Sequence, residues 1–254
     1  MTVKIVSDLH SRVEALRNEI APNDTLLLLG DLINIVDYTA MEGILVDVFG
    51  VRTVQEVVAL RAERRFDEAR AVIARRREGR GSKVRDHFVA LTRKAYREVR
   101  DALPHRTCVI FGNADSPSMA EELAGPGVEF VDGKVVELQG LRVGFVGGGL
   151  PTALGVAGEI SEAEFDAKLD GVGEVDVICT HMPPDLPELT YDTLAARHER
   201  GSPRLLEYIR EVRPRRAYFG HIHQPLVSST HVGPTHVVNA GYFRRTARAV
   251  PLDF

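Results

Sequence analysis

The sequence has few cysteines, no long hydrophobic run and no low-complexity segment. Its two cysteines, Cys108 and Cys179, each lie within an apolar run, which indicates buried thiols and excludes a disulfide-based scaffold. No stretch approaches the roughly 20 uncharged apolar residues that a membrane helix needs. Lys4 and Asp8 interrupt the apolar start, and no cleavable small-residue site follows, so we expect no export signal. We therefore expect a cytoplasmic protein without a membrane partner.

The overall composition is that of a folded, enzyme-sized protein. Hydrophobic residues make up 44% of the 254 residues, and charged residues make up 27%. This balance supplies a sizeable core and excludes intrinsic disorder and collagen-like repeats. The formal net charge of -4 argues against a general nucleic-acid binder.

The first thirty residues predict a strand–helix–strand unit. The β-branched run at 2–6 predicts a short strand. Ser11 followed by Glu14 has the spacing of a capping box, and an apolar helical stripe continues from it to Ile20. The almost wholly apolar run Thr25–Leu29 is typical of a strand that is buried on both faces.

Residues 34–105 follow a different pattern, that of long helices. One apolar helical stripe covers residues 54–73, and a second covers residues 84–99. The run Gly79-Arg80-Gly81-Ser82 separates them. We expect one domain over residues 1–254, in which residues 34–105 form a helical, Arg-rich insertion.

Strand patterns return after the insertion. They predict strands at 107–111, 135–138, 141–146 and 175–179, and closing strands at 216–219, 226–230 and 236–239. Helices are expected at 161–169 and after Ser202-Pro203, where a capping residue precedes a proline at the first helical position. The mixture indicates an α/β fold class.

Five short polar motifs each directly follow a predicted strand. They are Asp8-Leu9-His10, Gly30-Asp31, Gly112-Asn113-Ala114-Asp115, Thr180-His181 and Gly220-His221-Ile222-His223. Open α/β sheets bind ligands at the carboxyl ends of their strands, so these motifs predict one shared site. Oxygen and imidazole ligands without thiolate favour Mn, Fe, Zn or Co.

In this order, the motifs resemble the pattern D-x-H, G-D, G-N-H-[D/E], H and G-H-x-H of the calcineurin-like metallophosphoesterases. The resemblance spans the chain from Asp8 to His223. It implies a two-sheet mixed β-sandwich flanked by helices, in four layers. It also implies two divalent or trivalent metal ions, of which Mn is favoured.

The resemblance assigns a role to each matching residue. Asp8, His10 and His223 would hold the first metal, Asn113, His181 and His221 the second, and Asp31 would bridge both. Two cations about 3.5–4 Å apart need an anionic bridge, and they lower the pKa of a bound water enough to give hydroxide near neutral pH. The expected nucleophile is therefore a metal-bound hydroxide, and Asp31, Asn113 and His181 are the expected catalytic residues.

The chain departs from the family pattern at Ala114, where the G-N-H-D motif has a histidine. That histidine helps to stabilise or protonate the departing oxygen. Loss of a general acid costs roughly 10²–10⁴-fold in rate. Because every metal ligand is retained, the enzyme interpretation stands, and esters with good leaving groups are favoured.

Several motif residues also have a structural interpretation. A histidine is often structural, Asp8 could cap the next helix, and Asn113 could serve a turn. Their ordered occurrence favours metal binding. Asp115 is expected to be a structural carboxylate near the site, and Gly147-Gly148-Gly149 a tight turn that passes close to it.

The insertion permits two interpretations. Between Arg52 and Arg106 there are sixteen Lys and Arg residues against eight Asp and Glu residues. The segment is either a solvated helical pair, packed on the domain or on a second copy in a homo-oligomer, or a cap that adds positive potential for a phosphorylated substrate or nucleic acid. Only Phe66, Phe88 and Tyr96 offer rings for base stacking there, which disfavours nucleic acid.

We expect a phosphoesterase that hydrolyses a phosphodiester or an activated phosphate ester of a small phosphorylated substrate, such as a nucleotide. Three alternatives on the same fold remain open: a phosphomonoesterase, a nuclease that uses the basic insertion, and a catalytically weak metal-binding scaffold.

Overall fold

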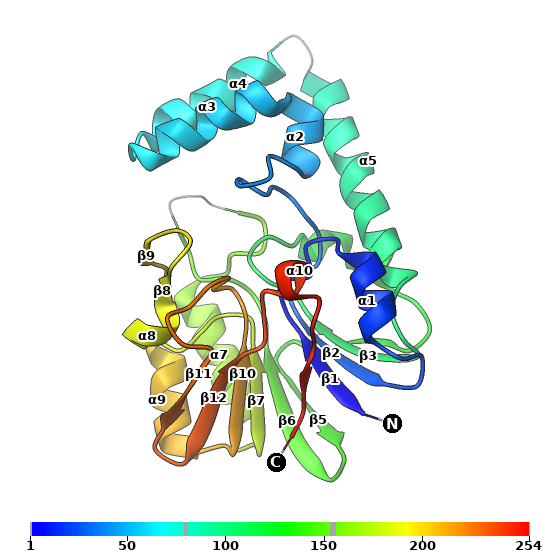
Figure 1. Ribbon diagram of the computed structural model, residues 1–254, viewed down its shortest axis with the longest axis vertical. Coiled ribbons are helices and arrows are strands. Elements are labelled where there is room, and N and C mark those ends of the chain that lie inside the picture. The colour runs from blue at the N-terminus through cyan, green and yellow to red at the C-terminus, as the bar shows by residue number, and fades with distance from the viewer. Residues whose placement is uncertain (1, 79–80, 153–155, 254) are drawn as a thin grey trace.

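The computed structural model describes residues 2–78, 81–152 and 156–253. Two large β-sheets lie face to face with helices on their outer sides, and a group of helices extends beyond the carboxyl ends of the strands (Figure 1). Both chain termini lie at the opposite end of the molecule. The predicted two-sheet sandwich flanked by helices is confirmed.

The first sheet has the order β13-β1-β2-β3-β4. Its strands are β1 (Val3–Val6), β2 (Thr25–Leu29), β3 (Arg106–Ile110), β4 (Val128–Phe130) and β13 (Val250–Pro251). The first four run parallel, and β13 pairs antiparallel with β1 at the edge. Helix α1 (Val13–Glu19), the short turn η1 (Pro117–Met119) and helix α6 (Ala120–Leu123) belong to the connections between these strands.

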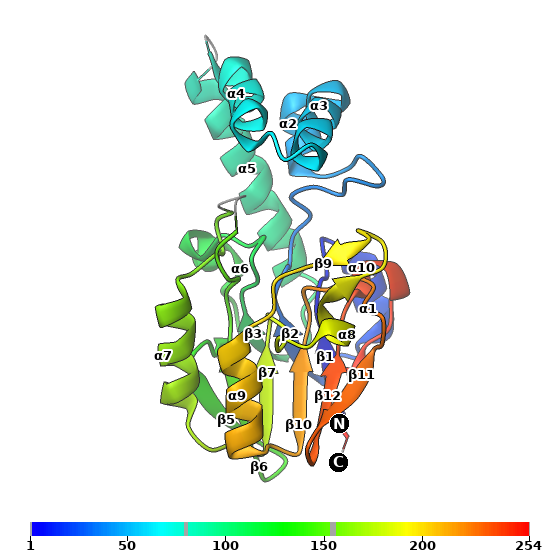
Figure 2. The same ribbon diagram turned by 90° about the vertical axis from the view of Figure 1, so that its left-hand side faces the viewer.

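The second sheet has the order β11-β12-β10-β7-β6-β5. Its strands are β5 (Lys134–Leu138), β6 (Leu141–Val146), β7 (Val177–Thr180), β10 (Arg216–Phe219), β11 (Ser229–Val232) and β12 (Thr235–Asn239). The inner four are parallel, and the edge strands β5 and β11 are antiparallel to their neighbours. Figure 2 shows helices α7 (Glu162–Val172) and α9 (Pro203–Val212) on its outer face.

Short elements complete the loops above the second sheet. They are α8 (Pro187–Thr190) and the two-stranded ribbon of β8 (Tyr191–Asp192) and β9 (Arg197–His198). Helix α10 (Phe243–Thr246) follows β12 in the chain and packs through Phe243 in the core on the outer side of the first sheet. In the part of the chain that the structure describes, no helix is long and apolar enough to cross a membrane.

Alternate residues along a strand face opposite sides of its sheet, so each sheet packs against a different layer on each side. In β2, Leu27 and Leu29 face the second sheet in the central core, while Leu26 and Leu28 pack with α1 and α5 (Gly81–Arg100) on the other side. All five residues of β2 are buried, which is the expected result of having covered faces on both sides. A third core joins the second sheet to α7 and α9.

The described residues of the segment between β2 and β3 contain four helices: α2 (Ile44–Phe49), α3 (Val51–Ala62), α4 (Phe66–Arg77) and α5. The single helical stripe predicted for 54–73 is wrong, because the chain reverses near Arg64, whose φ is +59°. The reversal lets Val57 of α3 pack on Ala69 and Val72 of α4 in a small core of its own. Gly79 and Arg80, the first two residues of the predicted break between the two helical stripes, lie outside the described residues.

The predicted capping box at Ser11 is also wrong. Ser11 has a φ of +61°, and α1 begins at Val13 after Arg12 without a side-chain cap. The Ser11 hydroxyl instead accepts a hydrogen bond from the backbone N–H of Asn34, at 2.9 Å. The cap predicted at Ser202 is confirmed, and Ser161 caps α7 in the same way, since each hydroxyl accepts a bond from a backbone N–H three residues on.

Candidate metal centre

The loops that carry the motifs adopt a rare backbone conformation at the ends of their strands. Asp8, His10, Asp31 and His221 have φ values of +55°, +41°, +53° and +69°. Non-glycine residues in this region are uncommon and cluster at functional sites. Backbone bonds hold the turns together, because Asp8 N–H donates to Gly30 C=O at 3.0 Å and His10 N–H donates to Asp31 C=O at 2.9 Å.

Close approach of the loops also depends on Gly220. A Cβ at this position would lie 1.8 Å from Ser7 Oγ and 2.5 Å from Asp8 Oδ2. Because it has no side chain, the motif after β10 can lie directly against the motif after β1. The backbone N–H of His221 then donates to Asp8 Oδ2 at 3.0 Å.

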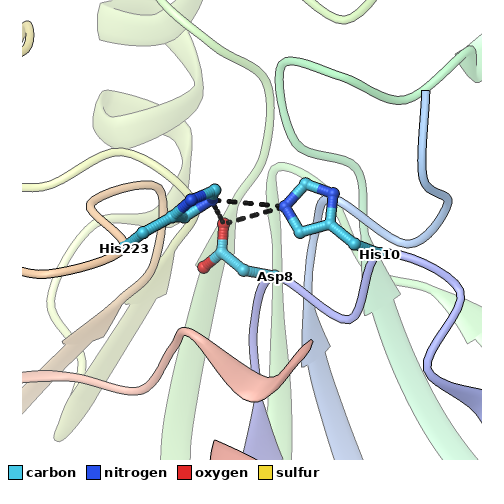
Figure 3. A group of neighbouring side chains, drawn as sticks. All are labelled: Asp8, His10 and His223. Carbon is cyan, nitrogen blue, oxygen red and sulfur yellow. Dashed lines mark hydrogen bonds and ion pairs between the residues drawn. The ribbon is translucent and has the colours of Figure 1, made fainter. Parts of the chain in front are cut away.

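The first group of side chains contains Asp8, His10 and His223 (Figure 3). Asp8 Oδ1 lies 3.6 Å from His223 Nε2 and 4.0 Å from His10 Nε2. The two imidazole nitrogens are 3.3 Å apart and point at one another. The set can offer one oxygen and two nitrogens to a single cation.

The second group contains Asn113, His181 and His221. Asn113 Oδ1 lies 2.9 Å from His181 Nε2 and 2.8 Å from His221 Nδ1. His181 Nδ1 lies 2.8 Å from the Leu29 carbonyl, which can only accept a hydrogen bond. If Nδ1 donates to this carbonyl, the lone pair of the neutral ring is at Nε2. Nε2 then faces the Asn113 amide oxygen, so that two acceptors lie next to each other. A cation between the two resolves this mismatch.

Asp31 lies between the two groups. Its Oδ2 is 3.8 Å from His10 Nε2, and its Oδ1 is 3.5 Å from His181 Nε2. Oδ1 also accepts a hydrogen bond from the backbone N–H of Ala114 at 2.8 Å. One carboxylate therefore presents a different oxygen to each group, which is the arrangement a bridging ligand needs.

Asp8 shows that the cluster fits a metal ion. Its Oδ1 is buried and makes no hydrogen bond within the described residues, and a buried carboxylate oxygen without a partner is costly. Burial alone would raise the pKa of Asp8, but the imidazoles of His223, His181 and His10 outweigh it and hold the pKa well below its usual range. The carboxylate is thus ionised and ready to bind a cation.

Burial also tunes the histidines. It lowers the pKa of His221 to about 4, with help from the nearby His181, and it lowers the pKa of His10. The neutral imidazole is the form that binds metals. Burial would lower the pKa of His223 as well, but the carboxylate of Asp8 outweighs it and the net pKa is raised.

Asp115 supports the cluster from behind. Its carboxylate accepts backbone N–H bonds from Asp31 at 2.8 Å, Leu32 at 3.0 Å and Gly112 at 2.8 Å. It joins the loops after β2 and β3, as a structural carboxylate would. Burial and the neighbouring Asp31 raise the pKa of Asp115 to about 7.

All seven residues predicted as metal ligands are brought together by these contacts. The side chain of Ala114 adds only a methyl group there, so it offers no acid group. Gly149 passes so close to Asn113 that a Cβ would lie 2.3 Å from the Asn113 Cβ, which agrees with the tight turn predicted for Gly147-Gly148-Gly149.

Tyr242 and Arg244 are residues at the site that sequence reasoning missed. The Tyr242 ring stacks on the His223 imidazole, with centroids 3.9 Å apart and planes within 4°. Arg244 donates to the His10 carbonyl at 3.0 Å. Both follow β12 in the chain, and the only signal was that a strand ends there.

Comparison with known proteins agrees with this geometry. The family model for calcineurin-like phosphoesterases matches residues 1–225. A solved crystal structure aligns with 95% of this chain and 91% of its own, at 22% identity and a TM-score of 0.60, and this likeness supports the fold. No curated protein sequence matches the chain. The chain therefore belongs to the calcineurin-like phosphoesterases, a family of dinuclear metal enzymes that hydrolyse phosphate esters.

Proposed function

We propose that the protein hydrolyses a phosphodiester or an activated phosphate ester of a small phosphorylated substrate, with two metal ions held by the seven clustered residues. The observation that carries the proposal is Asp31, which turns one carboxylate oxygen toward each ligand group. When bound, such a pair of metals activates water and neutralises phosphoryl charge. Manganese is the metal we favour, because the donors are oxygens and imidazoles.

Different side chains have different roles at the site. Asp8 and Asp31 supply the negative charge that offsets the cations. The Leu29 carbonyl orients the His181 ring, and the Tyr242 ring holds the plane of His223. These contacts keep the imidazoles in place before substrate binds.

The diesterase preference rests on Ala114. Without an imidazole there, the leaving oxygen receives no proton from this position, so esters with stable leaving groups should react best. The test compares p-nitrophenyl diesters with simple alkyl monoesters. Faster turnover of the alkyl monoesters would contradict the preference, and Ala114→His should raise their turnover if the missing acid limits the rate.

The bridging role is tested by Asp31→Asn. We expect loss of bound metal from both sites and a fall in kcat of about 10²-fold or more, because a central charge is removed. Metal content per chain is measured alongside activity with Mn²⁺. The matched control is Asp170→Asn, at an exposed residue paired with Arg204 on the protein surface. Two metals and a wild-type rate in Asp31→Asn would refute the assignment.

A small substrate is favoured over nucleic acid by the charges of the insertion. Several of its arginines are already paired on the same helix or turn: Arg65 contacts Glu63 and Glu68, and Arg70 contacts Asp67. Such pairs reduce the positive potential that a polyanion would need. Binding to an oligonucleotide that falls steeply with salt would instead support the nuclease alternative.

A further inference from the structure

A cavity of about 740 Å³ lies in the insertion, among α2, α3 and α4 at the top of Figure 1. Its size is within the range of pockets that hold small organic ligands. Much of its wall is apolar and comes from all three helices: Leu45, Phe49, Val54, Phe66, Ile73 and Ala74. Such a wall suits an alkyl or aromatic group.

The same cavity has a cationic part. Arg61, Arg70 and Arg77 line it together with Glu78. Because Arg70 is paired with Asp67, Arg61 and Arg77 supply its excess of positive charge. Arg61 also donates a hydrogen bond to the hydroxyl of Tyr38 at 2.6 Å, which places a guanidinium and a phenol at one side of the wall. An apolar wall with an excess of guanidinium groups is complementary to an anion that carries an apolar group.

One short segment of chain connects the metal centre with the cavity wall. The backbone N–H of Leu45, in the cavity wall, donates to the Ile35 carbonyl at 2.9 Å. Ile35 is four residues from Asp31, a separation of at most about 14 Å. The next link is Asn34, whose N–H donates to the hydroxyl of Ser11, beside His10.

A second chain of contacts joins the cavity to the first ligand group. Asp37, next to the wall residue Tyr38, accepts a hydrogen bond from Arg244 at 3.1 Å. Glu42 accepts another from Arg244 at 2.9 Å, and the same guanidinium donates to the His10 carbonyl. The root of the insertion is thereby fastened to the metal centre.

We propose that this cavity binds the apolar organic group of the ester, so that the substrates are anionic amphiphiles. The inference rests on the proposed function and deepens it by naming a substrate class. Each methylene that leaves water on binding should improve kcat/KM by up to about fourfold. An enzyme whose insertion only packs against solvent or a second copy would show no such dependence.

Binding is tested first, without catalysis. Because the chain has no tryptophan, Phe49→Trp provides a single fluorophore in the cavity wall. Below its micelle concentration, octyl phosphate should shift the emission to shorter wavelength and bind at least tenfold more tightly than octyltrimethylammonium. Ala71→Trp, at an exposed position of α4, is the matched reporter and should not respond.

Turnover is tested with ethyl, butyl and octyl esters of p-nitrophenyl phosphate. The wild-type kcat/KM should rise at least tenfold from ethyl to octyl, mainly through KM. Ala74→Trp fills the cavity and should remove this rise, whereas Ala71→Trp should keep it. A rise that persists in Ala74→Trp, or no rise in the wild type, overturns the proposal.

The two proposals fail in different ways. If Phe49→Trp responds to octyl phosphate but the chain with Asp31 intact hydrolyses no ester in the presence of Mn²⁺, the cavity assignment stands and the proposed function falls. If esters are hydrolysed at rates independent of chain length and the reporter is silent, only the cavity assignment falls. The cavity assignment is also overturned if sedimentation shows a dimer in which the reporter is buried and octyl phosphate does not bind. A second copy of the chain would then be what covers the cavity.

Discussion

Substitution of Tyr96 by phenylalanine tests how the insertion supports the metal centre. Tyr96 lies on α5 with a fully buried side chain. Its hydroxyl accepts the backbone N–H of Ser116 at 2.6 Å and donates to Asp115 Oδ1 at 3.3 Å. Tyr96→Phe keeps the ring and opens no large cavity, so the change isolates these two hydrogen bonds.

The magnitude follows from the group left unpaired. The Ser116 N–H would lose its acceptor in a buried environment, which costs about 1–3 kcal/mol, and the weaker bond to Asp115 adds about 1 kcal/mol. We therefore expect the free energy of unfolding to fall by about 2–4 kcal/mol. At an m-value of about 3 kcal/mol/M, the urea midpoint would drop by roughly 1 M.

The assay is urea unfolding in EDTA, so that bound metal does not contribute. The m-value should stay unchanged. Tyr218→Phe is the matched control, because its hydroxyl donates to Asp253 at a partly exposed position near the end of the chain, at 3.2 Å. Its loss should cost about 1 kcal/mol or less. Equal midpoints for the two variants would refute the claim that the Tyr96 hydroxyl is a structural link.

Three further outcomes are expected. Gly220→Ala should expel metal from the first group, because the added Cβ would clash with Ser7 and Asp8. Gly171→Ala is the control, since a Cβ there meets nothing within 4 Å. Two retained metals per chain in Gly220→Ala would contradict this packing argument. Burial raises the pKa of Cys108 to about 11 and also raises the pKa of Cys179. Neither thiol should therefore react with an aromatic disulfide reagent at pH 8 until the protein is unfolded in guanidinium. Rapid reaction of the native protein would disprove their burial. Mn²⁺ at 100 times its Kd should add about 2.7 kcal/mol of stability for each site that it fills, which calorimetry would detect as a rise in Tm of roughly 5–10 °C per site. The same rise in Asp31→Asn would argue that the ions bind elsewhere.

The parts of the fold predicted from sequence are those encoded by neighbouring residues. The almost wholly apolar run of β2 has the bounds that its local pattern predicts, and α9 begins directly after the predicted cap Ser202. Helix α7 begins one residue from its predicted start and ends three residues beyond its predicted end. The motif residues were found for the same reason, since each follows a strand directly. These residues come together because the carboxyl ends of parallel strands lie at the same edge of a sheet.

What escaped prediction depends on contacts between distant residues. Ser11 has the spacing of a cap, but its hydroxyl is taken by Asn34, 23 residues away. The reversal at Arg64 has no Gly or Pro to mark it, and the packing of Val57 on Val72 determines it. Tyr242 belongs to no motif, because its role comes from stacking on a histidine 19 positions earlier.

These distant contacts also explain why the insertion cannot be treated as an independent attachment. The Asp115 carboxylate accepts bonds from the loop after β2, from the loop after β3 and from Tyr96 on α5. A shift of α5 would therefore move the hydrogen bond that positions the Asp31 backbone. Arg244 makes a second link of the same kind, between the root of the insertion and His10. The insertion is thus tied to both ligand groups through two separate hydrogen-bonded paths, one behind Asp31 and one beside His10.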